Sequence, residues 1–203
     1  MELVTYFDVL NILFFALIWV GSVVFLRLKK KKSLPYLIFF TIFYVYLFKV
    51  LDYTLFQYQS LLLLKYFSAT LILNGQAGGE STNLVPLIGL SAQDLKTSLL
   101  NILLLVPYGF GLPFITNFHL KKIIAIGALF SIGIELLQLT TGLLAKMTFR
   151  IADINDVIFN TIGAMVGCVL FVGFVRAFRY MFHLKIPANP ISRYITDRPQ
   201  VKG

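Results

Sequence analysis

Long apolar stretches separated by short polar ones set the pattern of this chain. Five of the stretches reach the roughly 20 residues that a helix needs to cross a hydrocarbon layer about 30 Å thick. They are Val9–Leu28, Leu34–Leu55, Ser98–Thr116, Ile123–Thr141 and Val157–Phe174. A further apolar run, Leu61–Leu73, is shorter and is interrupted by Lys65, so we expect a re-entrant or interfacial helix there. The pattern predicts an all-α fold, a polytopic membrane helix bundle of five transmembrane helices plus this short helix.

Composition supports the same fold class. Of the 203 residues, 58% are hydrophobic and 13% are charged, whereas about a quarter of the residues of a soluble protein are charged. Five spans leave little chain for anything else, so we expect a single membrane domain over residues 1–203. The lone Cys168 excludes a disulfide framework and a cysteine metal site.

The basic residues cluster in a way that indicates orientation. Thirteen of the 18 lysines and arginines fall in Arg27–Lys32, in Lys121–Lys122 and in a tail over residues 176–203 that we expect to be irregular. Five spans place all three clusters on one side, which predicts a multi-pass cell-membrane protein with its N-terminus outside and its C-terminus in the cytoplasm. The net charge of +9 therefore indicates topology and contact with membrane lipids, and no nucleic-acid partner is expected.

Polar side chains recur at helical spacing in the last two spans. Glu135 and Gln138 lie on a stripe of small residues, and Asp153, Asp156 and Asn160 share one face of the next span. A carboxylate is costly in hydrocarbon, so we expect the two stripes to face each other.

The predicted topology gathers polar residues in the outer half of the bundle, above a nearly apolar inner half. We infer an outward-facing polar vestibule. Its candidate ligand-binding residues are Asn101, Glu135, Gln138, Arg150, Asp153, Asp156, Asn160, Lys49 and Asp52. Buried charges need partners or water, so Lys49 is expected to pair with Asp52 or Glu135, and Arg150 with Asp153. The alternative is that these charges only hold the helices together.

Two spacings have competing interpretations. Asp153 and Asp156 form a D-x-x-D run, which suits either a divalent cation or capping of the last span. Gly163 and Gly167 form a small-xxx-small pair that favours close helix packing. The two histidines fall on the cytoplasmic side, and G-x-S-x-G, P-loop and H-E-x-x-H motifs are absent. We therefore assign no catalytic residue, no metal site and no cofactor.

Three blocks within residues 83–167 carry a resemblance to a known family. They are NLVPL at Asn83–Leu87, NILLLVPYGFGLP at Asn101–Pro113, and IELLQ followed by R-x-x-D-x-x-D-x-x-x-N-x-x-G over Ile134–Gly163. The chain resembles the VanZ family. The resemblance implies lowered susceptibility of Gram-positive bacteria to teicoplanin-type glycopeptides, without remodelling of the D-Ala-D-Ala target and without an agreed chemical mechanism.

Three hypotheses follow for the mechanism. The first is a binding protein whose vestibule engages the glycopeptide antibiotic or a lipid-linked peptidoglycan precursor. The second is a magnesium-dependent enzyme or flippase acting on a polyprenyl diphosphate, with Asp153 and Asp156 on the metal and Arg150 on phosphate. The third is a scaffold that recruits wall-synthesis proteins through its spans.

Overall fold

A computed structural model describes residues 2–56, 82–87, 92–145, 152–182 and 189–201. The expected short helix over Leu61–Leu73 and the candidate site residue Arg150 lie outside these ranges.

Five long helices confirm the predicted spans. They are α1 (Glu2–Leu28), α2 (Leu34–Leu51), α4 (Ala92–Ile115), α5 (Leu120–Ala145) and α6 (Ile154–Phe182). Each contains a segment long and apolar enough to cross a membrane, and the all-α bundle of a multi-pass membrane protein is confirmed. A π-helical turn, η1 (Asp52–Phe56), continues α2.

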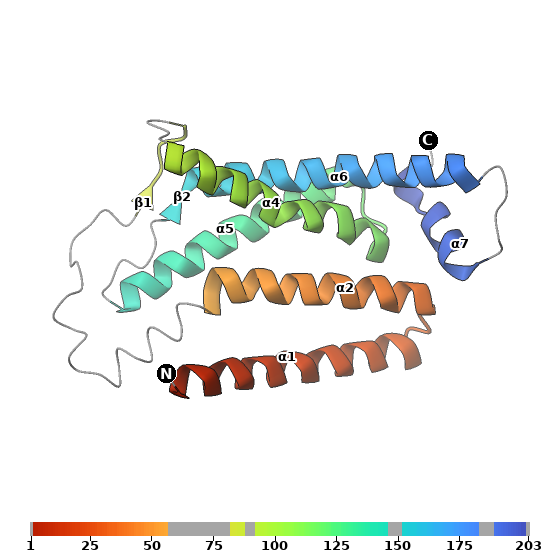
Figure 1. The fold of residues 1–203 in the computed structure, drawn as a ribbon, viewed down its shortest axis with the longest axis horizontal. Coiled ribbons are helices and arrows are strands. Elements are labelled where there is room, and N and C mark those ends of the chain that lie inside the picture. The colour runs from red at the N-terminus through yellow and green to blue at the C-terminus, as the bar shows by residue number, and fades with distance from the viewer. Residues whose placement is uncertain (1, 57–81, 88–91, 146–151, 183–188, 202–203) are drawn as a thin grey trace.

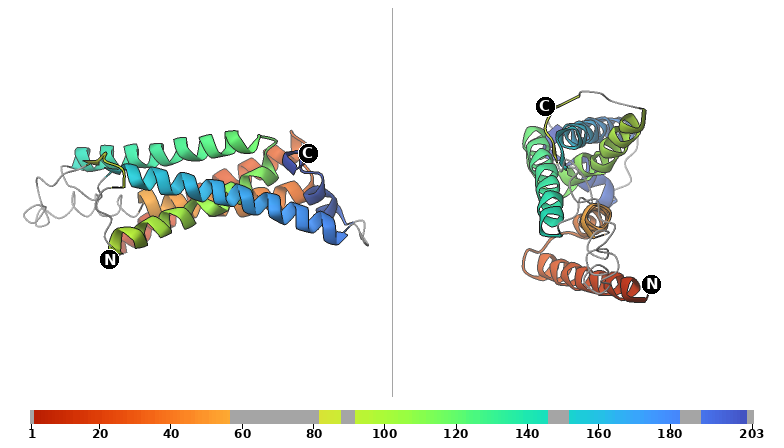
Figure 2. Two further views of the ribbon diagram at one scale, coloured as in Figure 1. Left: turned by 90° about the horizontal axis from the view of Figure 1, so that it is seen from above. Right: turned by 90° about the vertical axis from the view of Figure 1, so that its left-hand side faces the viewer.

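The helices lie nearly side by side along one long direction (Figure 1). Helices α4, α5 and α6 form the centre of the bundle, and α2 packs against α4. Helix α1 lies on the outer side of α2, away from α4 and α6, as the end-on view in Figure 2 shows. Hydrogen bonds join this outer pair. Trp19 Nε1 donates to Thr41 Oγ1 at 3.1 Å, and the Tyr44 hydroxyl donates to the Phe15 carbonyl at 2.8 Å.

Glycines let α4 and α6 approach at backbone distance. A Cβ added to Gly163 would lie 2.1 Å from the Ile102 carbonyl oxygen, and one added to Gly167 would lie 2.1 Å from that of Val106. On the facing helix, a Cβ at Gly109 would come equally close to a carbonyl oxygen of α6. The close packing predicted for the Gly163 and Gly167 pair is therefore confirmed, and it fixes the distance between the two helices.

Apolar side chains fill the bundle around the glycine contact and from there to the end of α4. One cluster of buried residues gathers around Leu105 and Tyr108 of α4, and a second around Phe114 of α4 and Phe171 of α6. The Phe114 and Phe171 rings meet edge to face with centroids 4.9 Å apart, a preferred aromatic geometry. This half of the bundle is the apolar part that the sequence pattern indicated.

The described part of the C-terminal tail beyond α6 is largely helical, so the expectation of an irregular tail is wrong there. It forms α7 (Pro190–Thr196) and a 3-10 turn, η3 (Pro199–Val201), which pack against α6. The Tyr194 hydroxyl and Arg198 Nη1 both donate to the Phe114 carbonyl, and Gln200 Nε2 donates to the Thr116 carbonyl at 2.8 Å. The last carbonyls of a helix have no partner within it, and here the tail supplies donors for α4.

The start of α7 explains why the prolines misled the sequence interpretation. Pro190 stands at the first turn, where a missing N–H costs nothing, and Asn189 caps the helix by accepting from Ile191 N at 3.0 Å. The same residue type that ends helices therefore begins this one.

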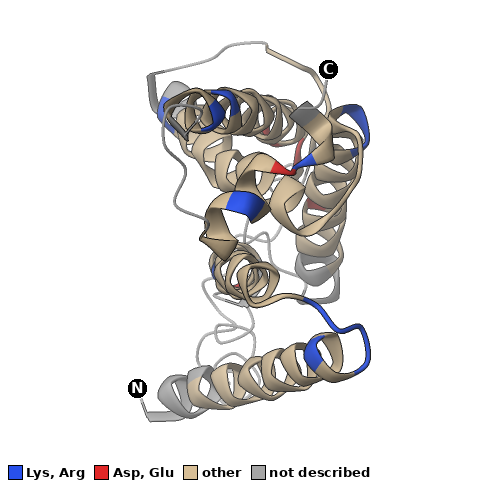
Figure 3. Ribbon diagram, turned by 90° about the vertical axis from the view of Figure 1, so that its right-hand side faces the viewer, with Lys and Arg blue, Asp and Glu red and all other residues tan. Residues whose placement is uncertain are grey.

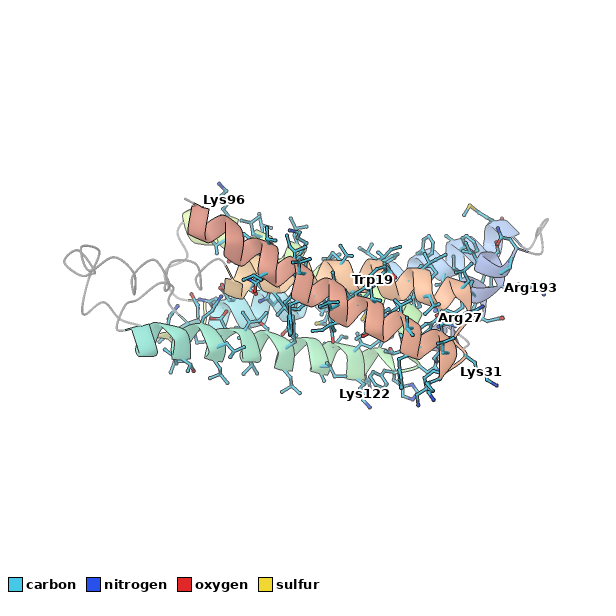
Figure 4. The ribbon with its side chains drawn as sticks, turned by 90° about the horizontal axis from the view of Figure 1, so that it is seen from below. Trp19, Arg27, Lys31, Lys96, Lys122 and Arg193 are labelled. Atoms are coloured by element: carbon cyan, nitrogen blue, oxygen red, sulfur yellow. The ribbon has the colours of Figure 1, made fainter. Side chains whose placement is uncertain are left out.

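The two ends of the bundle differ in charge. The turn between α1 and α2, the start of α5, and α7 all lie towards one end of the bundle, which we call the basic end. Figure 4 shows Arg27, Lys31, Lys122 and Arg193 there, one or more from each basic cluster. Figure 3, viewed towards this end, shows the α1–α2 turn coloured as basic. The clusters thus share one end as expected, while the orientation in the membrane stays a prediction.

Candidate functional site

The polar end of the bundle, opposite the basic end, begins at a short strand pair that the sequence did not predict. Strands β1 (Thr82–Asn83) and β2 (Ala152–Asp153) run parallel, with Asn83 opposite Asp153. Asn83 Nδ2 donates to Asp153 Oδ1 at 3.1 Å, and Asn83 Oδ1 accepts from Val85 N at 3.2 Å. This pairing ties the segment before α4 to the start of α6.

Asp153 and Asn155 organise the first turn of α6. Asp153 Oδ1 also accepts from Asn155 N at 2.8 Å, a carboxylate contact to a backbone N–H two residues on that is typical of helix starts. The buried Asn155 accepts from Leu87 N at 2.8 Å, at a residue whose φ is +59°. Of the two interpretations of the D-x-x-D run, these contacts match capping for Asp153.

Glu135 connects α5 to the same strand. Its Oε2 accepts from Asp153 N at 3.0 Å, and the side chain is buried at 8% exposure. The predicted facing of the α5 and α6 stripes is therefore what the structure shows at this level.

Asp156 joins α6 to α4. Its Oδ1 accepts a hydrogen bond from Asn101 Nδ2, and both residues are buried, at 8% and 6% exposure. A buried carboxyl group needs hydrogen-bond partners, and Asn101 supplies one. This contact fixes the first half of α4 against the start of α6.

Two further contacts extend the network in both directions along α5. Asn160 Nδ2 donates to Ser131 Oγ at 2.8 Å, deeper in the bundle, and Gln138 Nε2 donates to the Thr54 carbonyl of η1 at 2.9 Å. The amide oxygens Gln138 Oε1 and Asn160 Oδ1 are buried and have no hydrogen-bond partner within the described part of the chain. A buried acceptor without a partner is costly, which makes these two atoms candidate contacts for a ligand.

Lys49 and Asp52 lie outside this network. They form an ion pair with each other at 3.1 Å, and their side chains are 68% and 42% exposed. The prediction that Lys49 pairs with Asp52 or Glu135 is thus met by Asp52. An exposed pair of this kind contributes only about 0–1 kcal/mol.

The carboxylates at the start of α6 have separate partners. Asp153 accepts from Asn83 and Asp156 from Asn101. Among the described residues, no group of three or more His, Cys, Asp or Glu side chains is placed to hold a metal ion. The described contacts of Asp153 and Asp156 with other side chains are thus hydrogen bonds from asparagine amides.

Sequence reasoning did not select four residues that complete the network: Thr54, Asn83, Ser131 and Asn155. Asn83 had a signal, since it opens the NLVPL block, and Ser131 lies on the small-residue stripe that leads to Glu135. Asn155 and Thr54 had none, because one acts through a side-chain contact to Leu87 and the other through its backbone carbonyl.

Comparison with known proteins gives one family. A family model described as VanZ/LLP1 matches residues 13–176, which is more than half of the chain and includes the whole polar network. No curated protein and no solved structure matches the chain.

Proposed function

The chain belongs to the VanZ/LLP1 family, and from this premise we propose that it lowers susceptibility to teicoplanin-type lipoglycopeptides by binding the antibiotic at its polar end. The observation that carries the proposal is the buried network of amides and carboxylates that α4, α5 and α6 hold at one end of an otherwise apolar bundle. Polar side chains kept within a membrane bundle commonly mark a binding site.

The charge of the network favours the antibiotic over a lipid-linked precursor. Glu135, Asp153 and Asp156 are acidic residues, and the described lysines on the segments that lead to Thr54 and Asn101, which are Lys49 and Lys96, are exposed. A precursor carrying a diphosphate brings anionic oxygens to an acceptor-rich surface, which is unfavourable without a cation. A glycopeptide brings amide N–H and hydroxyl donors instead.

The depth of the network suits an acylated ligand. Asp156 is two residues into α6 and Asn160 is six, so at 1.5 Å per residue they lie roughly 3 and 9 Å below its start. If the acyl chain of a ligand enters the hydrocarbon, its peptide part lies near the membrane surface, at the depth of Asp156 and Asn160. Teicoplanin carries an acyl chain and vancomycin does not, and the family resemblance implies lowered susceptibility to the teicoplanin type.

The orientation of the bundle follows the basic end. Lysine and arginine clusters near span ends favour the cytoplasmic side, which supports an orientation with the basic end in the cytoplasm and the polar end outside. In this arrangement the network faces the side on which the antibiotic arrives.

The experiment is a susceptibility assay in a strain carrying the gene. The unaltered protein is expected to raise the inhibitory concentration of teicoplanin much more than that of vancomycin. Glu135→Gln, which keeps the size of the side chain but removes its charge, and Asn160→Leu are expected to restore sensitivity. Thr140→Val is the matched control, because this α5 residue bonds only to the Leu136 carbonyl of its own helix among the contacts described.

Two results would contradict the proposal. One is full teicoplanin resistance in both variants at equal membrane abundance. The other is turnover of a polyprenyl diphosphate by the purified protein that requires magnesium, which would replace binding by catalysis.

A further inference from the structure

Directly after β1 the chain forms a short loop of exposed apolar residues. This LVPL loop (Leu84–Leu87) lies at the end of the bundle opposite α7, where Figure 1 shows β1. Its side chains are exposed, at 74% for Leu84, 51% for Val85 and 56% for Leu87. The loop has no charged residue, whereas the connection between α1 and α2 at the basic end consists of four lysines and a serine. Apolar side chains that lie together on a surface mark a contact with a membrane or another molecule.

Two asparagine side chains hold the backbone of the LVPL loop. Asn83 Oδ1 accepts from Val85 N at 3.2 Å, and Asn155 Oδ1 accepts from Leu87 N at 2.8 Å. Pro86 stands between them and has no backbone N–H. Each N–H group from Val85 to Leu87 therefore has an acceptor within the protein. Leu87 has a φ of +59°, a conformation that leucine keeps only where its surroundings hold it there.

These hydrogen bonds favour lipid over water as the medium around the loop. In water, solvent would supply an acceptor for any free N–H group. At the edge of the hydrocarbon water is scarce, and a polar group without a partner is costly there. The acceptor from α6 is itself shielded, since Asn155 is only 6% exposed. The loop thus combines apolar side chains on its surface with N–H groups that need no solvent.

The length of α6 places the loop at the membrane surface. Asn155 is the second residue of α6, and the apolar stretch of that helix, Ile154–Met181, is 28 residues long. At 1.5 Å per residue this stretch measures roughly 42 Å, which matches the thickness of about 40–45 Å of a bilayer with its headgroups. A helix of this length that is centred in the membrane has its first turn at the level of the headgroups, together with the loop bonded to it.

We propose that the LVPL loop anchors the polar end of the bundle in the lipid. The side chains of Leu84, Val85 and Leu87 insert among the phospholipid acyl chains just below the headgroups, and Asn83 and Asn155 hold the backbone at the surface. The occupant of this apolar surface is the phospholipid of the leaflet at the polar end, and the inference does not depend on the proposed function. It places the start of α6 at the edge of the hydrocarbon, where an amphiphile within that leaflet reaches it from the side.

Fluorescence quenching measures the depth of the loop in the full chain. Cys168→Ala removes the single native cysteine, and Leu84→Cys or Val85→Cys then introduces one site for an environment-sensitive fluorophore. Both positions are exposed, so the substitutions disturb little packing, and two sites protect against one that fails to fold. The protein is placed in nanodiscs of phosphatidylglycerol that contain a lipid spin label either near the headgroup or at the end of the acyl chain. Iodide is the quencher in water.

Two reference positions calibrate the measurement. Leu17→Cys lies in the middle of α1 and is 73% exposed, so it reports on the hydrocarbon. Lys31→Cys lies in the exposed turn between α1 and α2 and reports on water. Both loop positions are expected to be quenched about twofold or more by the shallow spin label relative to the deep one, and about threefold or more less by iodide than Lys31→Cys. Leu17→Cys is expected to show the opposite order of the two spin labels.

A pair of variants at Asn155 tests how the loop is held. Asn155→Leu removes the acceptor of Leu87 N, and Asn155→Asp keeps an oxygen at the same position. With the label at position 84, Asn155→Leu is expected to raise iodide quenching about twofold or more, because a free N–H group draws the loop towards water. Asn155→Asp is expected to leave the depth unchanged. Equal iodide quenching in the two variants would overturn the part assigned to Asn155.

Two results at the loop positions would overturn the inference as a whole. One is iodide quenching equal to that of Lys31→Cys with no effect of either spin label, which would place the loop in water. The other is quenching by neither iodide nor lipid, which would show that protein covers the loop. Teicoplanin susceptibility is a separate measurement, so failure of the anchor leaves the proposed function as it stands.

Discussion

Replacing Gly163 by alanine tests the contact that sets the spacing of α4 and α6. The added methyl carbon would lie 2.1 Å from the Ile102 carbonyl oxygen and 3.1 Å from the Ile102 Cα. Ordinary contact distances between carbon atoms are about 3.5–4.0 Å, so the helices must separate by roughly 1 Å. The obstacle is backbone, which cannot rotate away as a side chain does.

The size of the effect follows from two opposing contributions. Overpacking of a closely packed contact costs about 1–3 kcal/mol, while alanine in place of glycine within a helix contributes up to about 1 kcal/mol. We therefore expect Gly163→Ala to lower the free energy of unfolding by about 1–2 kcal/mol. The separation also strains the hydrogen bond from Asn101 to Asp156, which joins the same two helices.

Gly173→Ala is the matched control, because it lies on the same helix and, within the described residues, no atom beyond the adjoining helix backbone comes within 4 Å of its added carbon. It is expected to be neutral or slightly stabilising. Unfolding is followed by SDS titration with far-UV circular dichroism, and opening of the contact by maleimide labelling of Cys168, the single cysteine, which is 3% exposed. Equal stability and equal labelling of the two variants would refute the argument.

Further predictions concern the two ends of the bundle. Asn101→Leu removes the donor to the buried Asp156 carboxylate and is expected to destabilise the fold by about 1–3 kcal/mol in the same SDS titration; an unchanged midpoint would contradict this. Tyr194→Phe together with Arg198→Ala removes two donors to the Phe114 carbonyl, so backbone amides of α7 should exchange hydrogen at least tenfold faster. Unaltered exchange in this double variant would show that other contacts hold the tail. Burial raises the pKa of Tyr194 above its usual value, with the Arg198 guanidinium partly opposing the rise. The neutral phenol therefore favours docking of the tail, and protection of α7 should be complete below about pH 10 and be lost as pH rises through the raised pKa.

The amino-acid sequence determined the spans, the small-residue contact and the level of the polar residues. Each of these depends on a local property. Hydropathy over about 20 residues identifies a span, Gly163 and Gly167 are one turn apart on one helix, and Glu135 and Gln138 share a face by spacing alone. The sequence therefore established which side chains avoid lipid before any partner was known.

The tertiary structure decided which polar groups meet. Asn83 and Asp153 are 70 residues apart in the chain, and Asn101 and Asp156 are 55 apart. Several asparagines could satisfy each carboxylate by type, and the choice among them follows from how closely α4 approaches α6. The sequence likewise did not predict that the tail docks on α4. Arg198 donates to the Phe114 carbonyl across 84 residues, and such a side-chain contact produces no periodic pattern in the sequence. Periodicity specifies the face of a helix, whereas the partner across that face is fixed only when the helices pack.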